Sequence, residues 1–337
     1  MEKAVLITGV AGLIGSNLAD WILANRPEYT VVGVDDLSDG YLDNVDSRVH
    51  LYFRDAGSPL DDIFTAFDVE YVFHFAARAA EAMAGFNRCF FHSNNIVTSA
   101  NVINHSIKYG VKRFVFASSM SVYGRNAPPF TEEQYPLPID SYGIGKYAVE
   151  LDLAAAYDQH GLEYSIFRGH SIYGPKQSLW DKYRNVIGIF MHRVLNNEPM
   201  TIYGAGLQRR AFTYIDDILP AIWMCATEDA MRNETYNIGA DETVSIHDLY
   251  RMLSDITGFD KVEYLPPIYE VLHAYCDHSK AKLQLNLNCP TPLYDGLRKM
   301  WKWAEAQPER SVKIWNRFEI ENGLYGMWKD SNGNSNE

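Results

Sequence analysis

The stretch Ala4-Val5-Leu6-Ile7-Thr8-Gly9-Val10-Ala11-Gly12-Leu13-Ile14-Gly15 places three spaced glycines directly after a short apolar run. A helical pattern follows over residues 17–24. Glycines between a strand and a helix allow a tight turn, and they bring backbone N–H groups close to a pyrophosphate at the positive end of the helix. An ordinary strand-to-helix turn is the alternative. We predict a dinucleotide-binding loop whose contacts come from Gly9, Gly12, Leu13, Ile14 and Gly15.

Two acidic residues end the second apolar run, 31–34, about 20 residues past the last glycine, where a carboxylate can bind the adenosine ribose. Asp35 would accept hydrogen bonds from the ribose hydroxyls, and together with Asp36 it would repel a 2′-phosphate. We therefore expect NAD rather than NADP as the cofactor. Two solvated turn aspartates are the alternative. Further along the chain, Asp55 and the adjoining Ala56 are expected near the adenine ring.

Apolar runs rich in Val, Ile and Phe alternate with longer amphipathic stretches through the first half of the chain. The runs are 4–7, 31–34, 71–75, 114–117 and 164–167, and the helical stretches between them include 94–108 and 146–159. Strand alternating with helix predicts an α/β fold with a doubly wound parallel sheet. After Gly174 this pattern weakens, and helical pieces are expected at 186–195, 218–225 and 246–253.

This change of pattern divides the chain. We expect a dinucleotide-binding domain over residues 1–174, to which later segments can return, and a smaller substrate-binding lobe over residues 175–330. The polar tail 331–337 is expected to be disordered.

Charge and cysteine content exclude several classes of partner. Lys and Arg number 30 against 43 Asp and Glu, a net charge of −13, so the general field repels polyanions and we expect no nucleic-acid partner. The four cysteines lie far apart without a C-x-x-C pair, so we expect neither a metal site nor a disulfide framework. No apolar run approaches the roughly 18 residues of a membrane span. These features predict a soluble, cytoplasmic protein in a reducing compartment.

Tyr142 and Lys146 form a Y-x-x-x-K pair that places a phenol and an ammonium on one face of a predicted helix. A tyrosine that acts as a base near pH 7 needs its pKa lowered by about three units, roughly 4 kcal/mol, and a nearby ammonium favours the phenolate. Three serines follow the buried run 114–117, at the strand end that faces the ligand crevice in such sheets. Each feature alone is common in surface helices and turns. Together with the glycine loop, they predict that Ser119, Tyr142 and Lys146 share a substrate hydroxyl proton.

The sequence resembles a known family, the extended short-chain dehydrogenase/reductases, and within it the NAD-dependent nucleotide-sugar epimerases and dehydratases. The matching blocks, in family order, are the glycine loop, Ser118-Ser119-Met120-Ser121-Val122-Tyr123-Gly124, the Y-x-x-x-K pair, Arg168 with Tyr173-Gly174-Pro175, residues 208–217 (QRRAFTYIDD) and Tyr236-Asn237-Ile238-Gly239. The resemblance extends from about Lys3 to Trp303. It implies a Rossmann-type sheet with a smaller C-terminal substrate-binding lobe.

The resemblance also implies catalytic roles. Tyr142 resembles the family's base and Ser119 its hydroxyl partner. Lys146 resembles the residue that holds the nicotinamide ribose and lowers the tyrosine pKa. Asn94, in the block Asn94-Asn95-Ile96, is similar to an asparagine that lines the same site.

Binding residues follow in the same way. The strand end against which the family's cofactor rests is matched by Phe75, Ala76 and Ala77. Asn185 and Arg210 resemble residues that bind the nucleotide diphosphate, and guanidinium donors suit a dianion in a net-negative protein. A plain surface charge is the alternative for Arg210.

Positions that differ from the family's motifs reduce the number of reactions that the chain is expected to catalyse. The 4,6-dehydratases carry an Asp-Glu pair where this chain has Met120 and Ser121, so water elimination is disfavoured. The GDP-mannose 3,5-epimerases carry a cysteine at Ser121 and a lysine near Asn185, and both are missing here. Ser171 replaces the family's diphosphate asparagine, and a second arginine expected near 267–268 is absent. Because these two residues are absent, the sequence does not indicate which nucleotide the substrate carries.

Ala274 stands where related 4-epimerases carry a residue that controls the room beside the sugar's C2 substituent. Alanine would leave space for an N-acetyl group where tyrosine would not; an alanine that merely fills the core is the alternative. The resemblance implies a homodimeric UDP-glucose 4-epimerase-like isomerase of carbohydrate metabolism. It would act at C4 of a nucleotide sugar through a transient 4-keto intermediate, with NAD retained. Net oxidation or reduction of a nucleotide sugar and a non-catalytic NAD-binding sensor stay open, although sensors tend to lose the tyrosine and lysine.

Overall fold

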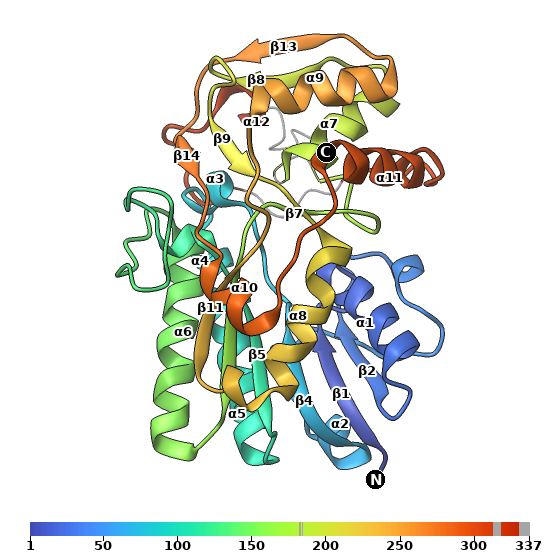
Figure 1. Cartoon of the computed structure of the whole chain (residues 1–337), viewed down its shortest axis with the longest axis vertical. Helices are drawn as coiled ribbons and strands as arrows, with labels where there is room; N and C mark the ends of the chain where they lie inside the picture. The colour runs from blue at the N-terminus through green and yellow to red at the C-terminus, as the bar shows by residue number, and fades with distance from the viewer. Residues whose placement is uncertain (182, 184, 313–317, 330–337) are drawn as a thin grey trace, which may run out of the picture.

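Seven parallel strands form the central sheet of the protein, whose computed structural model describes residues 1–181, 183, 185–312 and 318–329 (Figure 1). The strand order is β11-β6-β5-β4-β1-β2-β3. The bounds are β1 Lys3–Thr8, β2 Thr30–Asp35, β3 His50–Phe53, β4 Asp68–His74, β5 Arg113–Ser119, β6 Tyr164–Gly169 and β11 Glu234–Ile238. The order changes direction between β1 and β4, where open parallel sheets form a ligand-binding crevice. The doubly wound sheet expected from the sequence is confirmed.

Helices cover both faces of the sheet because consecutive strand residues are apolar. The covering helices are α1 Leu13–Asn25, α2 Asp61–Ala66, α5 Thr98–Lys108, α6 Ser141–His160 and α8 Ile215–Thr227. Val5 and Ile7 of β1 belong to the core that includes residues of α1 and α8. Ala4 and Leu6 belong to the core that includes residues of α2, α5 and α6. Strands buried on both faces read as continuous apolar runs, which made them visible in the sequence.

A smaller lobe lies above the sheet in Figure 1, beyond the carboxyl ends of the strands. Its helices are α7 Val186–Leu195, α9 Ile246–Thr257 and α11 Leu293–Glu305, and its strand groups are β7 Ile172–Tyr173 with β10 Thr213–Tyr214, β8 Met200–Tyr203 with β13 Val262–Leu265, and β12 Thr243–Ser245, β9 Arg209–Ala211 and β14 His273–Ala274. The fully buried Phe190, Leu249 and Leu297 join α7, α9 and α11 in one core. The shorter helical segments are α3 Glu81–Ala84, α4 Arg88–His92, α10 Ser279–Leu285, α12 Gly326–Lys329, a π-helical turn at Ser93–Val97 and single turns at Leu42–Asn44, Met120–Val122 and Asp229–Met231.

The chain crosses between the sheet and the lobe more than once. Strand β11 pairs with β6, and α8 packs on the sheet, although both fall within the range 175–330 expected for the lobe. That range therefore supplies the outer strand of the sheet as well as the lobe. The tail 331–337 lies outside the described residues. Within the described part of the chain, no helix is both long enough and apolar enough to span a membrane.

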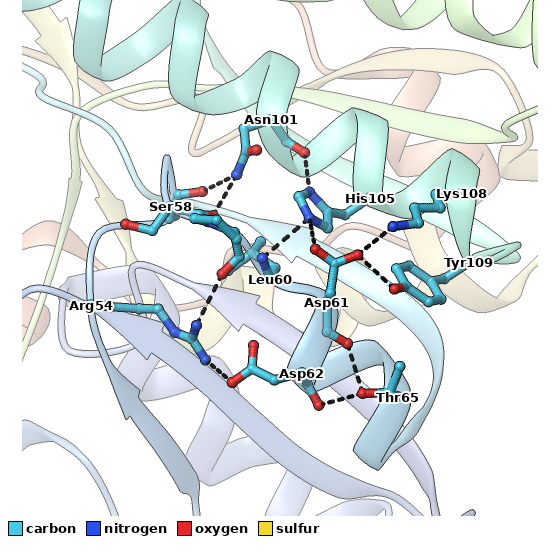
Figure 2. A network of polar contacts seen from close by, with 12 residues as sticks. Arg54, Ser58, Leu60, Asp61, Asp62, Thr65, Asn101, His105, Lys108 and Tyr109 are labelled. Atoms are coloured by element: carbon cyan, nitrogen blue, oxygen red, sulfur yellow. Dashed lines mark hydrogen bonds and ion pairs between the residues drawn. The ribbon is translucent and has the colours of Figure 1, made fainter.

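A polar network holds the loop after β3 in place (Figure 2). Asn101 of α5 donates from Nδ2 to the carbonyl oxygens of Ala56, at 2.8 Å, and Ser58, at 2.9 Å. One turn later, Nε2 of His105 accepts the backbone N–H of Leu60 at 3.2 Å. This loop carries the residues expected near the adenine ring, so α5 sets their position.

Candidate active site

A cavity of about 1160 Å³ opens where the smaller lobe meets the carboxyl ends of the strands. Every residue that the sequence analysis placed in the site lines it. These residues are Gly9, Gly12, Leu13, Ile14, Gly15, Asp35, Asp36, Asp55, Ala56, Phe75, Ala76, Ala77, Asn94, Ser119, Ser121, Tyr142, Lys146, Ser171, Asn185, Arg210 and Ala274. A single large cavity with converging polar groups is the usual form of a small-molecule site.

Two glycines of the loop leave no room for a side chain. Gly9 has a φ of +72°, and a Cβ on it would lie 2.7 Å from the backbone nitrogen of Ala76. A Cβ on Gly15 would lie 2.2 Å from the carbonyl oxygen of Gly9. Helix α1 begins after Gly12, which supplies no side-chain cap, and the first N–H groups of a helix have no acceptor within it. The loop therefore offers N–H donors at the positive end of the helix, which suits a diphosphate.

Asp35 lies at the end of β2 and is 9% exposed. Its two carboxylate oxygens accept hydrogen bonds from the backbone N–H groups of Ala11, at 2.9 Å, and Leu37, at 2.8 Å. The carboxylate is thus fixed beside the glycine loop, with lone pairs left for ribose hydroxyls. Asp36 and Asp55 are exposed at the same cavity. This acidic end of the cavity disfavours a phosphate substituent on the ribose.

Ser119, Tyr142 and Lys146 meet where β5 ends and α6 begins. Tyr142 is 6% exposed, and Ser119 is close enough to lower the pKa of its phenol. The Nζ atom of Lys146 donates to the carbonyl oxygen of Ala117 at 2.7 Å and lies 5.8 Å from the centre of the Tyr142 ring. Helix α6 starts here because Asp140 caps it by accepting a backbone N–H bond at 2.8 Å. The local sequence thus places all three groups together.

Burial opposes charge on both members of the Y-x-x-x-K pair. Burial and the nearby Glu81 carboxylate raise the pKa of Tyr142, while the neighbouring Ser119 lowers it. Burial lowers the pKa of Lys146 to about 7, and Glu150 acts in the opposite direction. Burial therefore favours the neutral forms of both groups.

Two serine hydroxyls near the tyrosine form hydrogen bonds that end at a carboxylate. Ser119 Oγ donates to Ser121 Oγ at 3.1 Å, and Ser121 Oγ donates to Glu81 at 2.9 Å. Glu81 begins α3, far from the serines in the sequence, so no spacing could reveal it. The structure places this carboxylate beside the position where the dehydratase pair is absent.

Two neighbouring asparagines differ in their contacts. Asn94 lines the cavity, and its side chain donates to the carbonyl oxygen of Phe90 at 2.8 Å. Asn95 is buried: its Oδ1 accepts the backbone N–H of Arg78 at 2.7 Å, and its Nδ2 donates to the carbonyl of Arg78 at 2.9 Å. Both lie in the π-helical turn, a form that is frequent at functional sites. Asn95, which the sequence analysis did not assign, holds the segment after β4 in place.

Arg210 of β9 is paired in register with Ala274 of β14. Its guanidinium donates to the Glu270 carboxylate at 2.7 Å and to the carbonyl oxygens of Val271, at 2.7 Å, and Leu272, at 3.1 Å. Burial lowers the pKa of Arg210 and raises that of Glu270. The sequence analysis missed Glu270 because the pair is 60 residues apart.

Ser171 and Asn185 both adopt positive φ angles, +42° and +50°. Asn185 caps α7 through Oδ1, which accepts the backbone N–H of Ile187 at 3.2 Å, and its Nδ2 donates to the carbonyl of Ile172 at 2.8 Å. The carbonyl of Ser171 accepts the backbone N–H of Thr213 at 3.2 Å. Both side chains therefore lie in tightly fixed turns on the lobe side of the cavity.

Comparison with known proteins identifies the family. The model of the NAD dependent epimerase/dehydratase family matches residues 5–239. The chain belongs to this family. Its resemblance to nucleotide-sugar epimerases and dehydratases, seen in the sequence, is confirmed.

Three solved structures of family members show the similarity over nearly the whole chain. The UDP-glucose 4-epimerase of Thermotoga maritima, with UDP-glucose, is 34% identical, with a TM-score of 0.85 over 90% of this chain and 98% of that one. The UDP-N-acetylglucosamine 4-epimerase of Methanobrevibacter ruminantium, in complex with UDP-N-acetylmuramic acid, is 28% identical, with a TM-score of 0.82 over 91% and 99%. The UDP-glucuronic acid 4-epimerase of Bacillus cereus, with UDP-glucuronic acid and NAD, is 27% identical, with a TM-score of 0.83 over 90% and 99%.

The cofactor of this epimerase/dehydratase family member is NAD, and the residues present fit it. Gly9 and Gly15 leave the close approach that a pyrophosphate needs, and Asp35 is held where a ribose can meet it. Arg78, which the sequence analysis missed, interacts electrostatically with Asp36 and Asp35, and burial lowers its pKa. Its charge partly balances the acidic end of the cavity.

Residues 318–329, near the C-terminus, form one side of the cavity, and the sequence analysis did not assign them to the site. The Glu319 carboxylate accepts the backbone N–H groups of Cys89, at 2.9 Å, and Phe90, at 2.8 Å. Tyr325 and Trp328 line the cavity. The aromatic residues in this otherwise polar stretch could have indicated that it packs against the rest of the protein. The stretch lies after the last of the family's sequence blocks, so the resemblance did not include it.

Proposed function

We propose that the protein is an isomerase that epimerises a UDP-hexose at C4 and retains NAD through the cycle. The observation that carries the proposal is that Ser119, Tyr142 and Lys146 together line the cavity that the glycine loop also lines, with Lys146 one helical turn from Tyr142. Relatives named as acting on UDP-glucose, UDP-N-acetylglucosamine and UDP-glucuronic acid support this substrate class.

In the proposed cycle, Tyr142 takes the proton of the C4 hydroxyl while Ser119 holds that hydroxyl at the end of β5. Bound NAD supplies a site that accepts a hydride from C4 and gives it back. The sugar then carries a ketone that is planar at C4, so the same residues serve either face once the sugar has turned. Tyr142 returns the proton to the ketone oxygen, and no net redox change results. A positioned acid–base group of this kind contributes about 10²–10⁴-fold to the rate.

The chain's own groups give the proton a reversible path. Burial raises the pKa of Tyr142 and lowers that of Lys146 to about 7, so the phenol must give up its own proton before it can take the proton of the C4 hydroxyl. The Ser119 hydroxyl donates to Ser121 Oγ, and Ser121 Oγ donates to the exposed carboxylate of Glu81. These groups offer a path from the phenol's surroundings to solvent for the proton that Tyr142 releases.

On the substrate side, we propose that Arg210 and Asn185 bind the nucleotide diphosphate and that Ser121 and Ser171 complete the wall. A diphosphate competes with Glu270 for the Arg210 guanidinium, because both present oxygen anions to one planar donor group. Ala274 is small and lines the cavity, which supports tolerance of an N-acetyl group at C2.

A homodimer is proposed on the exposed face of α6. Ile144 and Leu151 lie seven residues apart, hence on one face of the helix, and are 43% and 55% exposed. Covering such apolar residues favours self-association. Light scattering of the wild type and of Leu151→Glu tests this; a monomeric wild type would contradict it.

The test of function is an NMR time course without added NAD. The purified protein is incubated separately with UDP-glucose, UDP-N-acetylglucosamine and UDP-glucuronic acid, and we expect at least one to equilibrate with its C4 epimer. Tyr142→Phe, which keeps the ring, should retain bound NAD and lose turnover by about 10²–10⁴-fold.

Two outcomes would contradict the proposal. An NAD-loaded wild type that converts none of these sugars is not a UDP-hexose epimerase. Product that forms only with a stoichiometric change of added NAD to NADH would favour net oxidation instead.

A further inference from the structure

Three buried side chains with metal-ligand chemistry meet at a place that the proposed reaction does not use. His170 follows β6, whereas Cys276 and His278 lie between β14 and α10. One nitrogen of each histidine and the Cys276 sulfur all lie within 4.8 Å of one another. The two histidines are 108 residues apart in the sequence. Cysteine spacing alone therefore gave no sign of a metal site.

The hydrogen bonds of the two imidazoles fix where their hydrogens are. Nδ1 of His170 is 3.1 Å from the carbonyl oxygen of Ala211, and Nδ1 of His278 is 2.9 Å from the carboxylate of Asp241. A carbonyl and a carboxylate can only accept, so both Nδ1 atoms carry hydrogen. In a neutral imidazole this leaves a lone pair on Nε2. The two Nε2 atoms face one another at 2.7 Å, so a proton or a metal cation must lie between them.

Both imidazoles are buried, with His170 2% and His278 1% exposed. Two neutral imidazoles that donate from Nδ1 to a carboxylate and a backbone carbonyl have the outer contacts typical of metal-binding histidines.

We propose that His170, His278 and Cys276 bind one divalent transition-metal cation of the Zn²⁺ class. Imidazole nitrogen and thiolate sulfur are both Zn²⁺ ligands, and three protein ligands with one open position are typical of zinc sites that are not purely structural. With Zn–N bonds of about 2.0–2.1 Å, the Nε2 atoms would stand about 3.3 Å apart, so the two rings must separate from the present 2.7 Å when the metal binds. Metal binding releases the proton of the Cys276 thiol to solvent as the thiolate becomes a ligand.

The residues around the proposed site give the metal a way in from solvent. They also fix the positions of its ligands. His170 lines the large cavity, which gives the metal a route from solvent and a water for the fourth position. A Cβ on Gly239 would lie 2.2 Å from Nε2 of His170, so glycine is needed for this ring position. The metal would join the end of β6 to the β14–α10 segment, which carries Ala274 on the cavity wall.

Metal content and spectroscopy of the full chain test the proposal. The tag-free protein is treated with a chelator, dialysed, and loaded with Zn²⁺ or Co²⁺. We expect one Zn²⁺ per chain by elemental analysis. With Co²⁺ we expect the visible bands of a tetrahedral site together with a thiolate charge-transfer band. Zn²⁺ should also raise the thermal unfolding temperature.

Matched variants distinguish metal binding at this site from metal binding by another thiol of the chain. Cys276→Ser should lose the charge-transfer band, whereas Cys289→Ser, a second half-buried thiol nearby, should keep it. Asp241→Asn should weaken metal affinity by about 10–100-fold, the usual effect of losing an outer contact. A folded wild type that binds no stoichiometric Zn²⁺ and whose Co²⁺ spectrum equals that of Cys276→Ser would overturn the proposal. If a variant fails to fold, the Co²⁺ spectrum of the wild type alone decides.

Discussion

Replacing Lys146 with methionine should make the nucleotide-free protein more stable while abolishing turnover. Lys146 is 4% exposed, and its pKa falls from 10.5 to about 7 because burial disfavours the ammonium. Methionine has a similar length, and it fills irregular apolar space without a charge. The variant therefore removes the cost of burying a cation and keeps most of the packing.

The magnitude follows from the pKa. Each unit is worth about 1.4 kcal/mol, so the buried ammonium costs the folded state about 5 kcal/mol below pH 7. The variant also loses the hydrogen bond from Nζ to the carbonyl of Ala117, at 2.7 Å, which costs about 1–3 kcal/mol. We expect Lys146→Met to raise the free energy of unfolding by about 2–4 kcal/mol at pH 7.

The pH dependence has a definite sign. Below the folded-state pKa both states hold the proton, and the full cost is present. Between about pH 7 and the unfolded value of 10.5 the unfolded chain binds more protons, so the stability of the wild type rises with pH. The gap between wild type and variant should therefore narrow across this range.

Urea unfolding of the nucleotide-free proteins measures the gap at neutral pH and again at alkaline pH. The exposed Lys302→Met serves as the control, and its stability should follow that of the wild type at each pH. A Lys146→Met protein less stable than wild type at neutral pH, or a gap that does not narrow with pH, would refute the reasoning.

Four further predictions concern activity. Glu81→Gln removes a charge that raises the pKa of Tyr142, so the acidic limb of the pH–rate profile should move to lower pH; an unchanged profile would show that Glu81 does not act on the base. Asp35→Ser should raise binding of NADP relative to NAD by about tenfold, roughly 1.4 kcal/mol, in nucleotide released on denaturation; a wild type that releases mainly NADP would oppose this. Ala274→Tyr should lose turnover of UDP-N-acetylglucosamine and keep that of UDP-glucose, and equal acceptance by both proteins would remove the size argument. Glu319→Ala should raise KM for the sugar nucleotide about tenfold with little change in kcat, since it frees the C-terminal wall from α4; an unaltered KM would count against that wall.

The parts of the fold that could be predicted are those buried on both sides. Strand β5 is wholly buried and β1 is buried except at Lys3, and the apolar runs within both strands were evident in the sequence. Strand β3 was not predicted because it lies at the sheet edge, with His50 and Phe53 exposed. Strand β11 belongs to a block that the sequence analysis noted, but its pairing with β6 joins distant segments. Edge exposure and long-range pairing leave no local pattern.

The candidate site divides in the same way. Its predicted residues come from short motifs, each of which folds into one strand end or helix start, and the carboxyl ends of parallel strands then gather at one edge. The contacts that were missed all join separate elements: Glu270 with Arg210, Asn95 with Arg78, and Glu319 with α4. No spacing rule covers such pairs, because the intervening chain length is arbitrary.

The Y-x-x-x-K pair shows why geometry and chemistry are not equally predictable. Four residues on one helix suffice to set Lys146 beside Tyr142, so the sequence alone could give their arrangement. Their protonation depends instead on what covers them. Tyr142 is buried in a cluster with Met83 and Phe91 and with residues of the C-terminal segment, and Glu81 adds its charge from α3. Because those contributions arrive from three other parts of the chain, the direction of both pKa shifts follows only from the folded structure.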